Sequence, residues 1–369
     1  MSNKQPYVLW ALMLLSVLAS GCASSIQLGN RIGTDVFYDS SKTTVSIGNA
    51  LEKNSVIWEE SMYGQFSENN FQTAGRYVFV GDVTGRVYCF DLETGDEVGS
   101  LSRRSESLSG GVMVSADILQ FVSIKRENVQ SSIVTYDLEK GKYISEQEIE
   151  DVLSGRLTKY NNGSFYLASK PGRTYKLNDT ATLNTKSGRI MSLDVQGNEL
   201  FIGEEVGILR TFDASSLKLQ RIDSLGTEPV VVKSGFSSLY ASSGKALYKF
   251  QSDSYKLLKK FTSDISDFLP IDSQRVLIAL NNGGMCLVNG DEIMDIGKIR
   301  GGFAISMHRI SQETLSLLTV DGTLFLYSID SNTLTDEFRQ EERFSVHPIP
   351  TKFGLIIGLE RGLLKLLDF

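Results

Sequence analysis

The chain has 369 residues, of which 41% are hydrophobic, and its formal net charge at pH 7 is −7. This composition is that of a globular protein, and the length allows either two ordinary domains or one large repeat structure. Phosphate binding requires concentrated Lys and Arg, and because this acidic chain has no basic cluster, we exclude nucleic acid as a partner.

The N-terminus has the pattern of a secretory signal peptide. Lys4 precedes an apolar run over residues 7–19, and small residues then lead to Cys22. The run is shorter than the roughly 20 residues that a membrane-spanning helix needs, and no later stretch is apolar for that long. We therefore predict a signal peptide over residues 1–21 and a mature protein that does not span a bilayer.

Small residues occupy the three positions before Cys22, an arrangement that resembles the bacterial lipobox. The resemblance implies that the thiol of Cys22 is acylated, and each buried methylene of an acyl chain adds roughly 0.8 kcal/mol of membrane affinity. Ala23 after the cysteine, rather than Asp, implies sorting to the outer membrane with the protein facing the periplasm. The alternative is an ordinary signal peptide followed by a coincidental cysteine. Residues 22–43, rich in Ser, Gly, Asn and Asp, are predicted to be the lipidated cysteine and a flexible tether.

A strand–turn–strand unit repeats along the rest of the chain. Residues 77–91 show it first, with Gly85 in the tight turn. The turn positions that align across the repeats are Gly85, Ser131, Gly172, Gly207, Gly244, Gly284, Gly322 and Gly362. Such a tight turn needs a residue with positive φ, and glycine suits it because glycine has no side chain that disfavours this conformation. A period of about 40 residues with several strands per repeat predicts an all-β, eight-bladed β-propeller with four-stranded antiparallel blades over residues 44–369.

The last repeat ends directly after its second strand, so its sheet lacks an outer strand. Two strand-like segments precede the first full repeat, residues 44–47 and 55–58. We predict that one of them supplies the missing outer strand, because closing the ring in this way covers sheet edges that would otherwise be open.

No pattern in the chain indicates an active site or a metal site. His308 and His347 are the only histidines, and we predict structural or surface roles for both. Cys89 and Cys286 lie in apolar strand patterns of distant repeats and are predicted to be small buried residues rather than a disulfide. We therefore predict no enzyme activity, no catalytic residues, no metal and no cofactor.

Aspartates recur at matching turn positions of the repeats. They are Asp91, Asp137 and Asp213. Because an active site is not repeated around a ring, this recurrence predicts hydrogen bonds to the turn backbone rather than acid–base chemistry.

The repeat resembles that of the quinoprotein dehydrogenases, whose blades have the form strand, Asp-x-x-Gly turn, strand, Asp-x-x-Thr-Gly. Residues 80–95 match this form. Those enzymes are typically longer, usually place a Trp in each blade and often use a vicinal cysteine pair, whereas this chain has only Trp10 and Trp58 and no adjacent cysteines. A periplasmic quinoprotein enzyme, or a sensor of a small ligand in the central channel, is the alternative hypothesis.

A lipobox, a tether, Trp58 and eight quinoprotein-type repeats resemble the layout of the BamB family. These propeller lipoproteins belong to the machinery that inserts β-barrel proteins into the bacterial outer membrane. Residues 58–95 resemble the opening blade of that family, and residues 223–231 resemble one of its inter-blade connections. The resemblance implies a non-enzymatic scaffold of the outer-membrane β-barrel assembly (BAM) complex, with unfolded outer-membrane proteins as clients.

In that family, two neighbouring inter-blade connections bind a periplasmic POTRA domain of the partner BamA. The resemblance places the corresponding partner-binding positions at Leu183, Thr185, Lys186, Asp223, Ser224 and Gly226. Leucine and positive charge are kept at Leu183 and Lys186, whereas the family's two acids fall at Ser224 and Gly226. We expect Leu183 to act as an apolar anchor and Lys186 to pair with a partner carboxylate. The alternative is that both connections are merely solvated loops.

Overall fold

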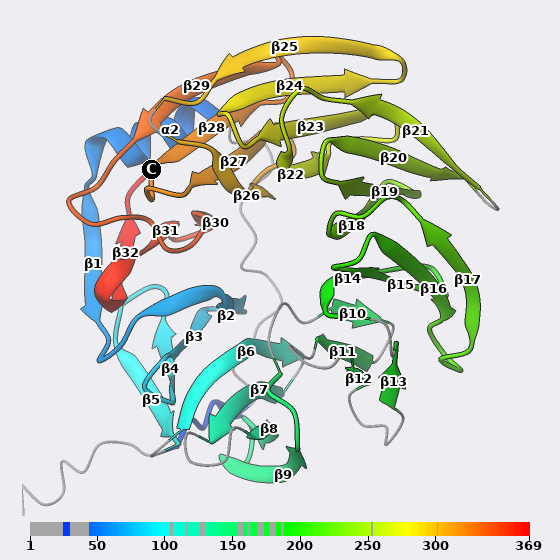
Figure 1. Ribbon diagram of the computed structural model, residues 1–369. Coiled ribbons are helices and arrows are strands. Elements are labelled where there is room, and N and C mark those ends of the chain that lie inside the picture. Colours follow the sequence, from blue (N-terminus) through cyan, green and yellow to red (C-terminus); the bar gives the residue numbers. More distant parts are fainter. Residues whose placement is uncertain are drawn as a thin grey trace, which may run out of the picture.

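The computed structural model describes residues 25–29, 44–103, 106–115, 117–125, 130–153, 158–160, 163–167, 173–176, 182–185, 188–251, 254–300 and 302–369. These residues form eight four-stranded antiparallel sheets, which are the blades of a ring (Figure 1). The predicted all-β, eight-bladed propeller is therefore confirmed. The predicted signal peptide, Cys22 and Lys186 lie outside the described residues.

Each of the first seven blades consists of four strands that follow one another in the sequence. Blade I contains β2 (Phe66–Ala74), β3 (Tyr77–Asp82), β4 (Arg86–Asp91) and β5 (Glu97–Ser102). Blade II contains β6 (Glu106–Ser115), β7 (Ile118–Lys125), β8 (Gln130–Asp137) and β9 (Lys142–Ile149). Blade III contains β10 (Thr158–Tyr160), β11 (Gly163–Leu167), β12 (Arg173–Lys176) and β13 (Thr182–Asn184). Blade IV contains β14 (Ile190–Gln196), β15 (Glu199–Glu204), β16 (Ile208–Asp213) and β17 (Leu219–Ser224).

The ring continues in the same manner through blades V to VII. Blade V contains β18 (Val230–Gly235), β19 (Ser238–Ser243), β20 (Ala246–Gln251) and β21 (Ser254–Lys260). Blade VI contains β22 (Ile265–Pro270), β23 (Arg275–Leu280), β24 (Gly284–Asn289) and β25 (Glu292–Lys298). Blade VII contains β26 (Ala304–Arg309), β27 (Thr314–Thr319), β28 (Leu324–Ser328) and β29 (Thr333–Phe338).

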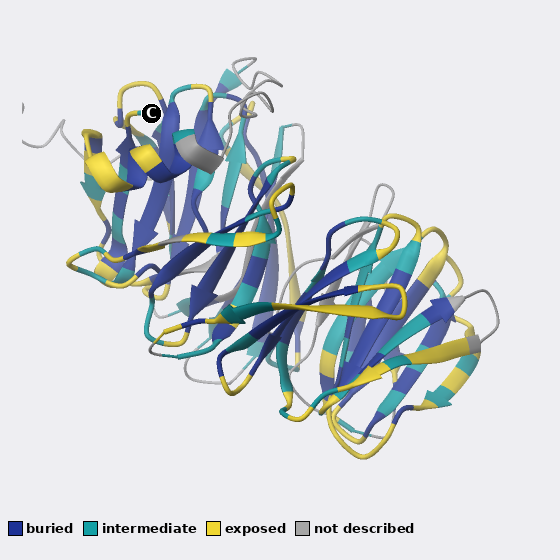
Figure 2. Ribbon diagram, turned by 90° about the horizontal axis from the view of Figure 1, so that it is seen from above, coloured by how far each residue is buried: buried dark blue, intermediate teal, exposed yellow. Residues whose placement is uncertain are grey.

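The position of a strand within its blade decides how apolar the strand is. The first strand of each blade faces the centre of the ring and the fourth lies at the rim (Figure 1). The middle strands are covered on both faces by neighbouring blades, and β3 is buried at every position. The outer strand β9, by contrast, is exposed at every position except Ile149. Figure 2 shows the same distribution, with buried strands inside the blades and exposed residues in outer strands and loops.

Blade VIII joins the two ends of the propeller. It contains β30 (Ile349–Thr351), β31 (Gly354–Leu359), β32 (Leu363–Leu367) and, as its outer strand, β1 (Val56–Ser61), with the short 3-10 turn η2 (Glu360–Gly362) between β31 and β32. Strand β1 pairs antiparallel with β32, so that Val56 lies opposite Leu367. The indole nitrogen of Trp58 also donates a hydrogen bond to the carbonyl of Leu92 in blade I (3.0 Å). The predicted closure of the last blade by an N-terminal strand is confirmed.

The other segment considered for this closure, residues 44–47, lies in a helix instead. Helix α2 (Thr44–Lys53) buries Ile47, Ala50 and Leu51, whose spacing places them on one helical face. This face packs against apolar side chains of blades VII and VIII. The strand-like appearance of residues 44–47 was therefore misleading, because their apolar positions continue with a helical period.

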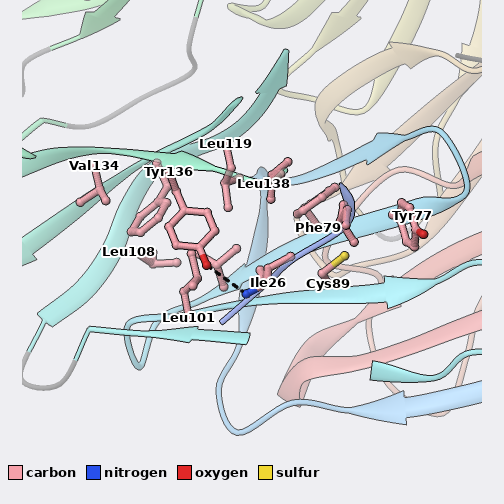
Figure 3. Close-up of a cluster of buried hydrophobic side chains, with 13 residues drawn as sticks. Ile26, Tyr77, Phe79, Cys89, Leu101, Leu108, Leu119, Val134, Tyr136 and Leu138 are labelled. Atoms are coloured by element: carbon pink, nitrogen blue, oxygen red, sulfur yellow. Dashed lines mark hydrogen bonds between the residues drawn. The ribbon is translucent and has the colours of Figure 1, made fainter. Parts of the chain in front are cut away.

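Residues 25–29, which we name the N-terminal clip, pack against blades I and II. They fall within the segment predicted to be a flexible tether, yet Ile26 and Leu28 are fully buried in the cluster drawn in Figure 3. The amide of Leu28 donates to the carbonyl of Leu138 (2.8 Å), and that of Ile26 to the hydroxyl of Tyr136 (3.2 Å). At these residues the chain is held by the propeller instead of extending freely from it.

Most of the aligned glycines lie in the turn between the second and third strand of a blade. Those with positive φ are Gly85, Gly207, Gly244, Gly322 and Gly362. In blade VI the left-handed residue is Gly283 (φ +81°), because Gly284 already begins β24. Ser131 lies inside β8, and Gly172 is outside the described residues.

These turn glycines have a second structural role that the sequence pattern does not reveal. In several blades, the carbonyl of the turn glycine accepts a hydrogen bond from a backbone amide in the connection that leads to the next blade. The amide of Arg103 donates to the carbonyl of Gly85 (2.8 Å), and the amide of Leu225 donates to the carbonyl of Gly207 (2.9 Å). The backbones approach so closely that a Cβ at Gly207 would lie 2.1 Å from the carbonyl oxygen of Gly226. Glycine is needed for this contact between blades as well as for the turn.

The recurring turn aspartates bond to the turn backbone, as predicted. Oδ1 of Asp91 accepts the amide of Glu93 (2.9 Å), and Oδ1 of Asp137 accepts the amide of Lys140 (2.8 Å). Asp213 accepts the amides of Ser215 (3.1 Å) and Ser216 (2.7 Å) together with both serine hydroxyls. Their recurrence therefore reflects turn formation.

The hydrogen bonds at Asp213 predict a pH-dependent contribution to stability. Those from Ser215 and Ser216 lower the pKa of Asp213 from 3.8 to about 2. Because the pKa of Asp213 is lower in the folded protein, its stabilising contribution is complete when the pH is above 3.8, the ordinary pKa. This contribution is lost as the pH falls through about 2. In urea unfolding, we expect Asp213→Ala to be less stable than wild type at pH 6 and the gap to narrow towards pH 2. An equal gap at both pH values would contradict this assignment.

Candidate interaction surface

The ring has two faces that differ in the loops they carry. Because the four strands of a blade alternate in direction, the hairpin between the second and third strands lies on the same face as the connections between blades. We call this the connection face. The opposite face, which we call the hairpin face, carries the hairpins between first and second strands and between third and fourth strands.

Both inter-blade connections predicted to bind a partner flank one hairpin of the connection face. The amide of Glu205, in the hairpin between β15 and β16, donates to the carbonyl of Arg189 in the preceding connection (2.9 Å). On the other side of the hairpin, the bond from Leu225 to Gly207 holds the following connection. The two connections and the blade IV hairpin therefore form one continuous surface.

The structure gives the predicted residues of the first connection a different setting from the one expected. Leu183, in β13, is buried against Ile190 and Phe212 of blade IV. Thr185 is buried as well. Alternate residues of an outer strand point towards the neighbouring blade, and Leu183 occupies such a position. The expected role of Leu183 as an apolar anchor does not agree with this burial, since its side chain already contributes to the core between blades III and IV.

The predicted residues of the second connection lie nearer to solvent. Ser224 and Gly226 are exposed, whereas Leu225 between them is buried. The Asp223 carboxylate is mostly covered and forms an ion pair with Arg221 at 2.6 Å. Asp223 therefore organises the outer strand β17. The connection presents exposed Ser224 and the exposed residues 226–229 to solvent.

The apolar group at the centre of this surface is Val206, which the sequence comparison with the BamB family did not identify. Its side chain is 46% exposed at the tip of the blade IV hairpin. Exposed Arg189 and Glu205 lie beside it, so that an apolar residue is flanked by charges of both signs. The side chain of Glu228, in the second connection, lies at Gly244 of the blade V hairpin. The sequence does contain one indication that Val206 is exposed. Val206 directly precedes the turn residue Gly207, and side chains at the tip of a hairpin are usually exposed.

A buried ion pair supports the hairpin from below. The Glu204 side chain at the end of β15 is inaccessible to solvent, and Nε of Arg210 on β16 lies 2.6 Å from its Oε1. A buried carboxylate is tolerated only when it is paired and hydrogen-bonded. This pair therefore fixes the relative positions of the two strands that carry Val206.

His347 is a buried structural residue, in agreement with the prediction. Its Nδ1 lies 2.7 Å from the hydroxyl of Ser316, and its Nε2 lies 2.9 Å from that of Ser306. Its ring stacks on His308, with ring centres 5.6 Å apart. Because Ser316 and His347 are both buried, a substrate in solution does not reach the serine oxygen.

Cys89 and Cys286 are unpaired and buried, as expected. Burial raises the pKa of Cys286 to about 11 and also raises the pKa of Cys89. Both thiols are therefore protonated at neutral pH. Across the described parts of the chain, no three His, Cys, Asp or Glu side chains gather closely enough to hold a metal ion.

A hollow of about 550 Å³ opens beside blade II and is lined by charged side chains. Nε of Arg103 lies 2.9 Å from the Glu106 carboxylate, and Nη2 of Arg103 lies 2.5 Å from that of Glu146. Lys125 pairs with Glu148. The charges of the hollow are thus satisfied mainly by one another.

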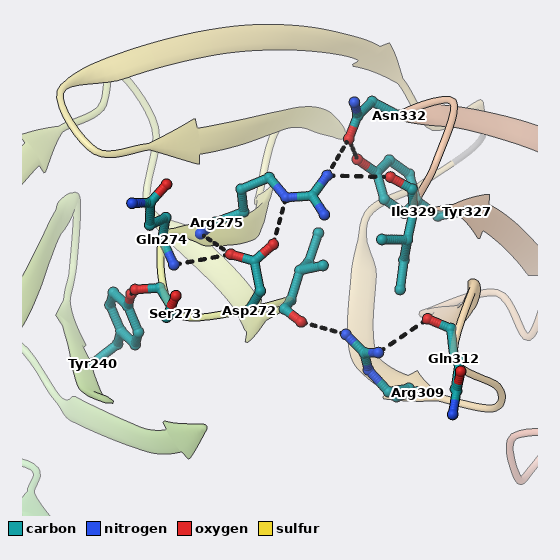
Figure 4. A network of polar contacts seen from close by, with 11 residues as sticks. Tyr240, Asp272, Ser273, Gln274, Arg275, Arg309, Gln312, Tyr327, Ile329 and Asn332 are labelled. Carbon is teal, nitrogen blue, oxygen red and sulfur yellow. Dashed lines mark hydrogen bonds and ion pairs between the residues drawn. The ribbon is translucent and has the colours of Figure 1, made fainter. Parts of the chain in front are cut away.

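A polar network on the hairpin face joins blades VI and VII (Figure 4). Arg275 pairs with Asp272 (2.6 Å) and also donates to the carbonyl of Ile329 (3.2 Å). Arg309 donates to the carbonyl of Gln312 (3.0 Å), and burial lowers its pKa. The bonds from Arg275 to Ile329 and from Arg309 to the carbonyl of Ile271 connect loops of adjacent blades and have a structural role.

Comparisons with known proteins identify the fold. No family model matches the sequence, and no curated protein matches it. The computationally designed Ika8 protein is similar in structure, with a TM-score of 0.66 and 12% identity over 84% of this chain and 98% of that chain. BamB from Moraxella catarrhalis has a TM-score of 0.62 and 10% identity over 85% of this chain and 97% of that chain. A chain of the Mitotic Checkpoint Complex has a TM-score of 0.52 and 13% identity over 74% of this chain and 92% of that chain.

At these identities the similarities show a shared propeller architecture. No helix in the described ranges is long and apolar enough to cross a membrane. The chain is therefore a multi-bladed β-propeller with BamB among its structural neighbours.

Proposed function

We propose that this protein is a non-enzymatic scaffold lipoprotein of the outer-membrane β-barrel assembly complex. In this proposal acylated Cys22 anchors the protein to the periplasmic face of the outer membrane. The propeller docks on the POTRA region of BamA and assists the insertion of barrel proteins. Unfolded outer-membrane proteins are its clients.

The observation that carries the proposal is the combination of a lipobox-like sequence at Cys22 with an eight-bladed propeller that is similar in structure to BamB over 85% of this chain and 97% of that chain. The lipobox supplies the location and the propeller supplies a rigid scaffold. Loops on such a scaffold bind partners at a low entropic cost, because the sheets fix their ends.

We propose that the docking surface is the blade IV hairpin together with its two flanking connections. Val206 would enter an apolar site on the partner, and Arg189 and Glu205 would face polar groups around it. Ser224 and Gly226, which are exposed, would lie at the edge of this contact. Lys186 belongs by sequence to the first connection, between blades III and IV, and its pairing with a partner carboxylate is part of the proposal.

The test of the function is co-purification. Tagged protein captured from outer membranes solubilised in mild detergent is expected to bring down the barrel-assembly subunit. Recovery of other proteins without that subunit would reject the scaffold function.

The test of the surface compares two valines at equivalent hairpins. Val206→Asp places a charge at the proposed contact and is expected to lower capture of the partner about tenfold or more, in the range of a hot-spot loss of about 2 kcal/mol. Val320→Asp is the control, because Val320 is 52% exposed at the blade VII hairpin, close to the 46% of Val206. Equal capture by the two variants would exclude blade IV as the docking surface. Leu183→Ala is unsuitable here because it would remove a buried core side chain.

Reconstitution with a quinone cofactor distinguishes the scaffold proposal from the alternative, a periplasmic quinoprotein enzyme or small-ligand sensor. Protein mixed with pyrroloquinoline quinone and Ca²⁺ is examined by absorbance and by dye-linked turnover. Bound quinone with turnover would replace the scaffold proposal with an enzymatic one.

A further inference from the structure

The N-terminal clip is bound to blades I and II by matched contacts along its length. Ile26 and Leu28 insert into the apolar cluster formed by side chains such as Leu101, Leu119 and Tyr136 (Figure 3). Its backbone is also held, because the amides of Ile26 and Leu28 each have a hydrogen-bond acceptor in blade II. Burial of these two aliphatic side chains, together with the two backbone hydrogen bonds, holds the segment against the propeller.

Two glycines of the propeller make room for the clip. A Cβ at Gly99, on the outer strand β5, would lie 2.3 Å from the carbonyl oxygen of Ser25. A Cβ at Gly141, in the turn between β8 and β9, would lie 3.1 Å from Cβ of Gln27. The clip therefore runs from the outer strand of blade I to the outer turn of blade II, in a seat shaped for it.

The seat limits where a lipid on Cys22 could reach. Only Ala23 and Ser24 separate Cys22 from Ser25. Three residues of extended chain span at most about 11 Å. An acyl group on Cys22 would therefore enter a bilayer close to the rim of blades I and II, and other parts of the ring would be held away from it.

The turn before β9 and the first residues of β9, beside the clip, carry side chains that suit contact with a membrane. Exposed Glu146 and Glu148 follow further along the same strand. At the start of β9, Tyr143 and Ile144 are exposed, and the ring of Tyr143 packs edge-on against Tyr136, which also bonds the clip (centroids 5.1 Å apart). Exposed Lys140 and Lys142 precede these two residues in the sequence, and Lys140 also pairs with Asp137 (3.0 Å). Tyrosine and lysine are favoured at lipid–water interfaces, since each has an apolar body and a polar tip.

We infer that the outer rim of blades I and II is the membrane-contacting surface of this protein. The clip fixes this orientation because only a short segment joins the lipid anchor to the bound residue Ser25. The inference rests on the proposed lipidation of Cys22. In this arrangement the propeller stands on one rim, with Tyr143 and Ile144 at the lipid surface. The blade VI rim, four blades further around the ring, points away from the membrane (Figure 1).

The test measures which rim approaches the bilayer. Full-length protein, expressed with its N-terminal segment and purified in detergent, is reconstituted with vesicles of phosphatidylethanolamine and phosphatidylglycerol that carry a nitroxide-labelled lipid as quencher. A fluorophore is attached at Ile144→Cys or, as control, at Met294→Cys. Both residues are third in their outer strands, in blades II and VI, and are 53% and 51% exposed. The native Cys89 and Cys286 are buried and do not compete for the label.

We expect severalfold stronger quenching at position 144 than at position 294. Equal quenching in membrane-bound protein would overturn the inference while leaving the lipid anchor intact. Protein that does not bind the vesicles at all would instead reject the lipidation on which the proposed function depends. The two failures are therefore distinguishable.

The role of the clip is tested with two further changes. Ile26→Ser combined with Leu28→Ser should release the clip and remove the difference between positions 144 and 294, whereas Gln27→Ser, at an exposed position, should preserve it. A 20-residue Gly-Ser insertion between Ser24 and Ser25 leaves the clip seated and adds about 25 Å of average reach. We expect the insertion also to reduce the difference in quenching between positions 144 and 294. An unchanged difference would show that the short segment between Cys22 and Ser25 does not set the orientation.

Discussion

Gly207→Ala is expected to lower the free energy of unfolding by about 2–5 kcal/mol. The residue has φ +78°, a conformation that disfavours any side chain, and the new Cβ would lie 2.1 Å from the carbonyl oxygen of Gly226. The backbone of the next connection would have to move, which would weaken the bond between Leu225 and Gly207. Chemical denaturation followed by circular dichroism measures the effect.

A second glycine in the same blade separates the two causes of this loss. Gly197, between β14 and β15, has φ +61°, and a Cβ added there would have no neighbouring atom within 4 Å. Gly197→Ala should therefore cost only the backbone strain, about 1–2 kcal/mol. If Gly197→Ala and Gly207→Ala are equally destabilising, close approach between blades contributes nothing.

Arg210→Met is expected to destabilise the protein by about 3–5 kcal/mol. The methionine would fill much of the space of the arginine but would leave the carboxylate of Glu204, which is inaccessible to solvent, without its nearest cation. A buried charge that loses its partner is far more costly than the pair itself. Combining Arg210→Met with Glu204→Gln should restore most of the loss, because the second change removes the buried charge.

An exposed ion pair gives the control for this experiment. Lys256 and Asp291 are 3.1 Å apart, with side chains 61% and 86% exposed. Exposed pairs contribute about 0–1 kcal/mol, so Lys256→Met should change stability very little. A comparable loss in both variants would show that burial of Glu204 does not govern the effect.

The repeat architecture could be predicted because it depends on local signals. A strand, a turn with glycine at positive φ and a second strand recur around the ring, and each element is set by residues close in sequence. The missing outer strand of the last repeat also indicated that an N-terminal segment closes the ring. The turn aspartates were predictable for the same reason, since Asp213 bonds residues two and three positions further on.

Features that depend on contacts between distant residues could not be predicted in this way. The clip looks like a linker by composition, and only the seat made by Gly99 and Gly141 shows that Ile26 and Leu28 are buried. Leu183 looked like a binding residue by its resemblance to a family motif, but the side of β13 on which it lies is decided by packing on blade IV. Val206 became visible as a candidate only when its exposure was known.

The pairing of β1 with β32 also has a consequence for the order of folding. Val56 and Leu367 lie near opposite ends of the chain, so this pairing is among the most non-local in the protein. Non-local pairings form late, because the entropy of closing the chain must be overcome first. During synthesis, β1 therefore remains unpaired until β32 has been made. Once joined, the ring has no terminal repeat from which unfolding can begin by fraying, unlike an open array of repeats.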